Sequence, residues 1–220
     1  MERLNGIVWR YDRHELIADG IVHGVGVVAA LIAVTALIFY ATVWGTPGAL
    51  ASAWIYGLGL IATLGISFAY NIWPVSPVKW FLRRLDHSSI FILIAATYTP
   101  FLVAGLPDPL ILGNLIGIWC LALFGVVIKC CWIGRFDRLA ILLYLGIGWS
   151  GIWLASRLSE VLPLATMILI LVGGIIYSAG VIFHVWERLR FQNAIWHAFV
   201  VVAAGVHYAA VVTCIVELGL

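Results

Sequence analysis

The sequence predicts an all-α membrane protein, a bundle of seven transmembrane helices with a cytoplasmic N-terminus. Hydrophobic residues make up 64% of its 220 residues and charged residues only 10%, whereas a soluble domain carries about a quarter charged residues on its wetted surface. Eleven Trp and eight Tyr fit a protein whose amphipathic rings lie at the lipid headgroups. Seven apolar stretches are each long enough to cross about 30 Å of hydrocarbon.

Turn-forming residues separate these stretches and agree with the hydropathy. The clearest turns are Gly45-Thr46-Pro47-Gly48, Pro74 through Pro77, Leu106-Pro107-Asp108-Pro109 and Leu162-Pro163. The Pro-Asp-Pro turn predicts that the third and fourth helices form a tight hairpin. We expect one membrane domain over residues 1–220, with spans at 20–44, 50–73, 86–105, 109–129, 137–156, 163–185 and 192–216.

The basic residues predict the orientation. With seven spans, 11 of the 12 Lys and Arg residues fall on one face of the membrane and only Arg157 on the other. Because cytoplasmic loops carry an excess of Lys and Arg, this face is expected to be cytoplasmic, with the N-terminus inside and the C-terminus outside. The residues of the basic face are Arg3, Arg10, Arg13, Lys79, Arg83, Arg84, Lys129, Arg135, Arg138, Arg188 and Arg190.

Other features narrow the range of partners. No basic run interleaved with aromatic residues suggests nucleic-acid binding. The four cysteines, Cys120, Cys130, Cys131 and Cys214, are interpreted as small apolar residues of the spans. The pairs Gly20-xxx-Gly24 and Gly113-xxx-Gly117 have the spacing of close helix packing. We interpret these pairs as intramolecular contacts and leave a homo-oligomer open.

Polar residues within the spans are predicted to gather at one depth. Such residues are costly in a membrane and commonly mark a functional site. Ser67 with Asn71, and Asn193 with His197, are spaced i,i+4 and so share a helix face. Paired ligands on one helix that meet a carboxylate from another can hold a metal ion. In the expected topology the cytoplasmic third contains Asp19, His23, Ser67, Asn71, Asp86, His87, His184, Asn193 and His197.

Four blocks of sequence carry a family resemblance. They are residues 15–26 (ELIADGIVHGVG), 67–71 (SFAYN), 85–87 (LDH) onward to 98–101 (YTPF), and 193–197 (NAIWH). In this order they resemble the hemolysin III family, the bacterial branch of the progestin and adipoQ receptors, whose animal members include the adiponectin receptors. The resemblance implies a seven-helix protein of the bacterial inner membrane.

The resemblance also implies a zinc site, from which this sequence departs. In the family the second-helix block normally ends in His, and the seventh-helix block normally reads His-x-x-x-His. The corresponding positions here are Asn71, Asn193 and His197, with Ser67 and Asp86 close by. Because an amide oxygen is a weaker zinc ligand than imidazole nitrogen, we expect a metal-free polar network. Weak or altered metal binding remains an alternative.

The two remaining histidines of this region have a simpler interpretation. His23 and His87 match family positions that are not zinc ligands, and we expect them to make structural hydrogen bonds. A substitute metal site formed by His23, His87 and His197 is the alternative at this stage.

Three functions remain in competition. The resemblance suggests a role in membrane lipid or energetics homeostasis, with membrane lipid as the partner. The second function is zinc-dependent hydrolysis of a lipid amide, as in ceramidases, with Asp86 as the base for a water molecule and Ser67 assisting the oxyanion. The two missing histidines argue against this hydrolase. The third is a pore, implied by the name hemolysin, although no span has a repeated polar stripe.

Overall fold

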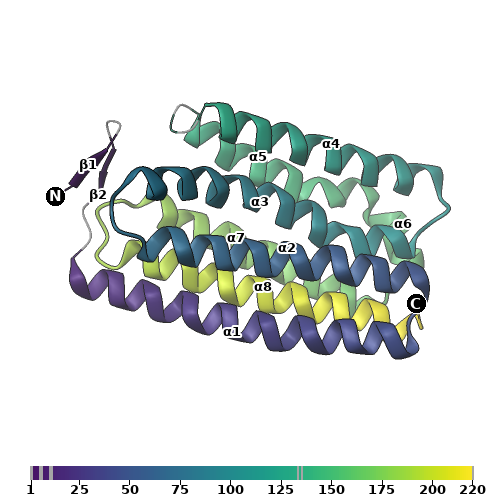
Figure 1. Cartoon of the computed structure of the whole chain (residues 1–220). Helices are drawn as coiled ribbons and strands as arrows, with labels where there is room; N and C mark the ends of the chain where they lie inside the picture. Colours follow the sequence, from purple (N-terminus) through teal and green to yellow (C-terminus); the bar gives the residue numbers. More distant parts are fainter. Residues whose placement is uncertain (1, 5–6, 10–11, 133, 135, 220) are drawn as a thin grey trace.

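Seven helices of the computed structural model are long and apolar enough to cross a membrane. The structure describes residues 2–4, 7–9, 12–132, 134 and 136–219, and it leaves undescribed the side chains of residues 2–4, 7–9 and 138. Within these residues the predicted all-α fold and the number of spans are confirmed. Consecutive helices run antiparallel, so the first helix begins and the last helix ends at opposite ends of the bundle (Figure 1).

The helices are close to the predicted spans, but several begin earlier or are divided. They are α1 (Arg13–Trp44), α2 (Pro47–Ile72), α3 (Pro77–Ala104), α4 (Pro109–Cys131), α5 (Asp137–Trp149), the 3₁₀ helix η1 (Ser150–Leu154), α6 (Ala155–Val161), α7 (Leu164–Val185) and α8 (Gln192–Glu217).

The N-terminal tail contains a short β-hairpin that the sequence did not suggest. Its strands β1 (Glu2–Leu4) and β2 (Ile7–Trp9) pair antiparallel. Helix α1 then begins at Arg13 rather than at residue 20, because Asp12 and Glu15 form a capping box. The Glu15 N–H donates to Asp12 Oδ1 over 2.8 Å, and this bond holds the pKa of the Asp12 carboxyl below its usual value.

Helix α3 also begins earlier than predicted, at Pro77 rather than at residue 86. Ser76 caps it and Pro77 occupies its first turn, a favoured arrangement at helix starts. Lys79 therefore lies inside the helix. Its buried ammonium group donates to the carbonyl oxygens of Tyr70 (2.9 Å), Asn71 (3.2 Å) and Trp73 (2.8 Å). A cation at the C-terminal end of α2 satisfies carbonyls that the helix leaves free.

The fifth span is interrupted, where a single helix was predicted. Between α5 and α6 the chain forms η1, and Tyr98 of α3 bonds to the backbone there. The Tyr98 hydroxyl donates to the Gly148 carbonyl over 2.5 Å and accepts from the Gly151 N–H over 3.0 Å. Irregular backbone at membrane depth needs such partners. The break therefore depends on a residue of another helix.

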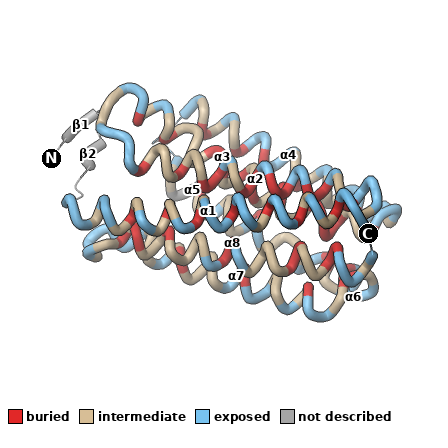
Figure 2. The backbone as a smooth tube through the Cα atoms, turned by 60° about the horizontal axis from the view of Figure 1, so that its bottom comes forward, coloured by how far each residue is buried: buried red, intermediate tan, exposed pale blue. Residues whose placement is uncertain are grey.

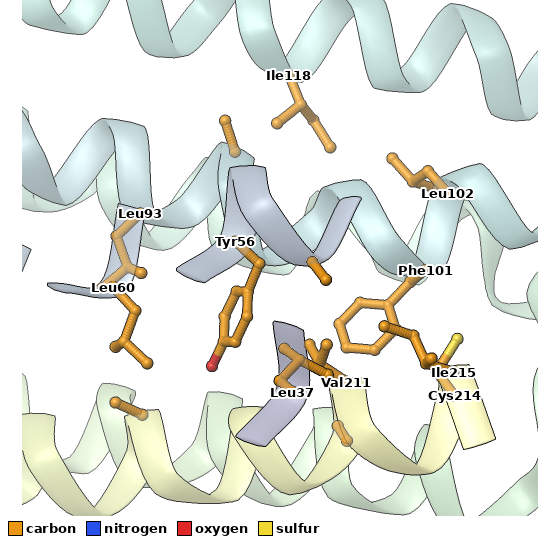
Figure 3. Packing of buried hydrophobic residues seen from close by; sticks show 14 of the residues in the cluster. Leu37, Tyr56, Leu60, Leu93, Phe101, Leu102, Ile118, Val211, Cys214 and Ile215 are labelled. Carbon is orange, nitrogen blue, oxygen red and sulfur yellow. The ribbon is translucent and has the colours of Figure 1, made fainter. Parts of the chain in front are cut away.

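The apolar core lies mainly between α1, α2, α3 and α8. Figure 3 shows Tyr56 and Leu60 of α2 pointing toward α8, with Phe101 of α3 beside Val211. Buried residues follow the inner sides of the helices and exposed ones the outer sides (Figure 2). Outward apolar residues such as Ile32 (67% exposed) and Leu142 (66%) form the surface that would face lipid.

Candidate functional site: a buried polar network

Polar side chains of α1, α2 and α8 meet at one end of the bundle. We call this the site end; it is where α1, α3 and α8 begin and α2 ends (Figure 1). A hydrogen bond from the Phe191 N–H to Glu15 Oε1 (3.1 Å) joins the start of α1 to the connection before α8. The convergence follows from the antiparallel order of the helices, as the sequence indicated.

Asp19 is the centre of this network. Its Oδ1 accepts a hydrogen bond from His197 Nδ1 over 2.6 Å, and its Oδ2 accepts one from Asn193 Nδ2 over 3.0 Å. Asp19 is 3% exposed and His197 8% exposed. A carboxylate buried to this degree needs such donors. Helix α1 supplies the acceptor and α8 supplies both donors.

His23 lies one turn after Asp19 on the same face of α1. Its Nδ1 donates to the Asp19 carbonyl oxygen over 2.9 Å and lies 3.5 Å from Asp19 Oδ1. Its Nε2 lies 3.2 Å from Ser67 Oγ of α2. The rings of His23 and His197 are in contact, with centroids 4.1 Å apart. His23 therefore bonds within α1 and to α2 while it packs against α8.

The two asparagines bond to each other. Asn193 Nδ2 donates to Asn71 Oδ1 over 2.9 Å, and Asn71 Nδ2 donates to the Ser67 carbonyl oxygen over 2.9 Å. The amide oxygen of Asn71, the atom that would bind a metal, is thus used as an acceptor. These bonds are of the kind expected for amides at the family's ligand positions.

Asp86 and His87 differ in their surroundings, although they are adjacent on α3. Asp86 is half-buried and lines the same cavity as Ser67, which places it beside the network. His87 Nδ1 lies 4.0 Å from Asp137 Oδ1 of α5. Among the described residues, Asp19, His23 and His197 each offer an atom that could bind a metal ion, and these three atoms lie within 4.8 Å of one another. The alternative site of His23, His87 and His197 is therefore not formed, because His87 faces α5.

The residues at the positions where the resemblance puts the zinc ligands do not fit a three-histidine zinc centre. Only His197 offers an imidazole, and the amides of Asn71 and Asn193 are hydrogen-bonded to each other. Asp19 was not predicted as a central residue. Its i,i+4 spacing from His23 was the available signal, but the rotation of α1 that turns both toward α8 depends on tertiary packing.

A cavity of about 1360 Å³ lies against this network. Ser67, Asn71, Asp86 and His197 line its polar end. Most of its apolar lining comes from α3, α5 and α7. The apolar lining includes Ile90, Leu93, Ile94, Phe101, Leu145, Ile170 and Leu171.

A charged cluster lies on the α3, α4 and α5 side of the cavity. Asp137 of α5 accepts from Lys129 Nζ over 2.6 Å and from Arg83 over 3.0 Å. Lys129 is 1% exposed. Burial raises the pKa of Asp137, but the hydrogen bond and charge of Lys129 and the charge of Arg83 outweigh burial and lower it overall. These groups tie the starts of α3 and α5 to the end of α4.

Seven apolar helices with a polar network and a cavity between them define an integral membrane protein of the seven-helix class. Residues 11–208 match the family model described as haemolysin-III related. The chain belongs to this family.

The relatives include bacterial and animal proteins. The chain is 38% identical to the hemolysin-3 homolog of Bacillus subtilis over 84% of this chain and 87% of that protein. It is 39% identical to hemolysin-3 of Bacillus cereus over 84% and 85%. It is also 32% identical to the human monocyte to macrophage differentiation factor over 73% and 68%.

Proposed function

We propose that the protein binds a membrane amphiphile in its cavity and acts in membrane lipid homeostasis. The observation that carries this proposal is the cavity itself, which joins a polar end to a long apolar wall. A ligand with a polar head and an acyl chain has this distribution of surface. Ligand sites are commonly concave and mostly apolar, with a few polar groups that fix orientation.

The polar end suits a head that both donates and accepts hydrogen bonds. Ser67 and His197 line this end together with the Asp86 carboxylate. An alcohol, amide or ester head can bond to such groups, whereas a purely apolar lipid would leave them unpaired. Part of the apolar wall is itself exposed, including Ile152 (61%) and Leu171 (51%). An acyl chain against these residues would reduce their exposure to water.

The experiment compares two leucines of α5. Leu145 lines the cavity, and Leu142 lies on the same helix but is 66% exposed and does not line it. Lipid extracted from the purified protein is identified by mass spectrometry. We expect a retained amphiphile, lowered occupancy in Leu145→Trp and wild-type occupancy in Leu142→Trp. A protein that retains no lipid, or equal occupancy in both variants, would contradict the proposal.

We further infer that the family's zinc centre is degenerate at its own positions. Asn71→His with Asn193→His would place three imidazoles where the resemblance puts the zinc ligands. Because imidazole binds zinc more strongly than an amide does, the double variant should bind zinc more tightly than the wild type. Isothermal titration with zinc measures this difference. Equal affinity would show that Asn71 and Asn193 do not occupy the family's ligand positions.

A further inference from the structure

We infer that Asp19, His23 and His197 form a binding site for a divalent transition-metal ion, made by α1 and α8 and sharing only His197 with the family's ligand positions. The three side chains are 3%, 2% and 8% exposed. Each offers a ligand atom, and these atoms lie within 4.8 Å of one another. Two imidazoles and a carboxylate are a donor set that Zn²⁺ and similar ions accept.

Binding a metal would rearrange two hydrogen bonds among these side chains. Asp19 Oδ1 lies 2.6 Å from His197 Nδ1 and 3.5 Å from His23 Nδ1. A tetrahedral ion with bonds of about 2.0–2.1 Å holds its ligand atoms roughly 3.3 Å apart. The pair at 2.6 Å is a hydrogen bond, so a metal would replace the proton shared by Asp19 and His197. Small side-chain rotations would open this pair to ligand spacing.

In Asp19 and His23, the side-chain atom that would not bind the metal already has a hydrogen-bonding partner. Asn193 Nδ2 donates to Asp19 Oδ2 over 3.0 Å, and Ser67 Oγ lies 3.2 Å from His23 Nε2. Metal ligands are commonly held in this way, through the atom that does not touch the metal. Asp19 Oδ1 and His23 Nδ1 lie 3.5 Å apart, and His23 Nδ1 would have to give up its 2.9 Å hydrogen bond to the Asp19 carbonyl oxygen in order to bind a metal. Asn193, which lies at a family ligand position, would then orient the metal ligand Asp19 instead of binding the metal itself.

The cavity leaves room for a further ligand. His23 and His197 both line it, so an ion bound by three protein atoms would keep a coordination position open to water or to a polar head. Sites with three protein ligands and an open position are the reactive kind. This inference does not rest on the proposed function, because metal binding and lipid retention are measured separately.

The test uses Co²⁺ as the probe, added to detergent-purified full-length protein after treatment with a chelator. Tetrahedral Co²⁺ has a visible absorption spectrum that reports the ligand set. We expect one Co²⁺ per chain, displaced by Zn²⁺. Asn193→Ala should weaken binding by about 10- to 100-fold, as for partners of ligands, and Asp19→Asn and His23→Gln should weaken it more than that.

Two control variants separate this site from its neighbours. His87→Gln removes an imidazole that faces Asp137 and should leave Co²⁺ binding unchanged. Asn71→Ala removes an amide at a family ligand position and should change binding less than Asp19→Asn. Gel filtration and thermal unfolding without metal establish that each variant is folded. If Asp19→Asn does not fold, His23→Gln carries the test.

Three results would overturn the inference. The first is wild-type protein that binds no Co²⁺. The second is binding that survives both Asp19→Asn and His23→Gln. The third is binding that Asn71→Ala abolishes and Asp19→Asn does not, which would place the metal at the family's positions. None of these results concerns lipid retention by the wild type. The proposed amphiphile binding is tested separately, by the lipid extracted from the purified protein.

Discussion

Tyr56 and Tyr208 are tyrosines of the bundle whose hydroxyl groups differ in their bonding. The Tyr208 hydroxyl donates to the Ala33 carbonyl over 2.7 Å and so joins α8 to α1. Tyr56 is 1% exposed, and its hydroxyl has no hydrogen-bond partner among the described residues. A buried polar group without a partner costs free energy, whereas a made bond contributes about 1 kcal/mol.

Replacing each tyrosine by phenylalanine should therefore have opposite effects. Tyr208→Phe should lower the free energy of unfolding by about 1 kcal/mol, and Tyr56→Phe should leave it unchanged or raise it. Thermal unfolding in one detergent compares both variants with the wild type. An equal loss in the two would mean that the Tyr56 hydroxyl has a partner after all.

At the site, the sequence predicts the membrane depth of the polar side chains better than the direction in which they point. Alternation of seven spans is enough to bring Ser67, Asn71, Asn193 and His197 to one level. The structure joins the first three by hydrogen bonds and joins His197 to Asn193 through Asp19. Depth does not determine which way a side chain faces. His87 was expected near the same group, but the position of α3 turns it toward Asp137 of α5. The rotation of each helix depends on its packing against the others.

Among the elements, glycine contacts show which helices approach closely. The Gly113-xxx-Gly117 spacing was interpreted as an intramolecular helix contact, and this interpretation is wrong. A Cβ built at either position meets no described atom within 4 Å. At Gly125 of the same helix, an added Cβ would lie 2.5 Å from the ring of Phe91, which is 1% exposed. The Gly113-xxx-Gly117 motif therefore lies away from the contact between α3 and α4. Gly125, which belongs to no such motif, lies in that contact.

Two alanine substitutions test this difference. Gly125→Ala should destabilise the protein by about 1–3 kcal/mol, because the Phe91 ring is held by its neighbours and overpacking forces a shift. Gly117→Ala should stabilise α4 by up to about 1 kcal/mol, since Ala is the better helix former. The midpoint of thermal unfolding reports both. A neutral Gly125→Ala would show that α3 and α4 can separate without cost.

Helix boundaries were predicted less well than helix number. Hydropathy summed over some 20 residues finds a span, but it does not detect the polar turns at helix ends. The early start of α3 depends on Ser76 and on the bonds of Lys79 to the end of α2. Those bonds allow a lysine to be buried within a helix, where its charge alone predicted a loop.

For the whole molecule, basic side chains gather at the site end. Arg190 lies 3.8 Å from Asp12, and Arg83 and Lys129 contact Asp137, all at this end. Arg157 pairs with Asp108 over 2.7 Å at the opposite end. Of the predicted basic residues, Arg10 and Arg135 lie outside the described residues, as do the side chains of Arg3 and Arg138.

We predict that the site end faces the cytoplasm of a bacterial inner membrane, because basic residues are retained on that side. A green fluorescent protein fused to the N-terminus should fluoresce, and alkaline phosphatase fused after Leu220 should be active. Green fluorescent protein folds poorly when exported, and the phosphatase requires export. Active phosphatase at the N-terminus would reverse the orientation, and activity at neither end would indicate an even number of spans.

The bond between Tyr98 and the broken fifth span links two positions that lie about 50 residues apart in the chain. In evolutionary terms, the Tyr98 side chain is constrained by the backbone break that it bonds to. A relative with phenylalanine at position 98 would leave the Gly148 carbonyl and the Gly151 N–H without this partner in the bilayer. Such a chain needs an uninterrupted fifth helix or a hydroxyl group from another residue. The tyrosine at position 98 and the break in the fifth span should therefore be gained and lost together during divergence.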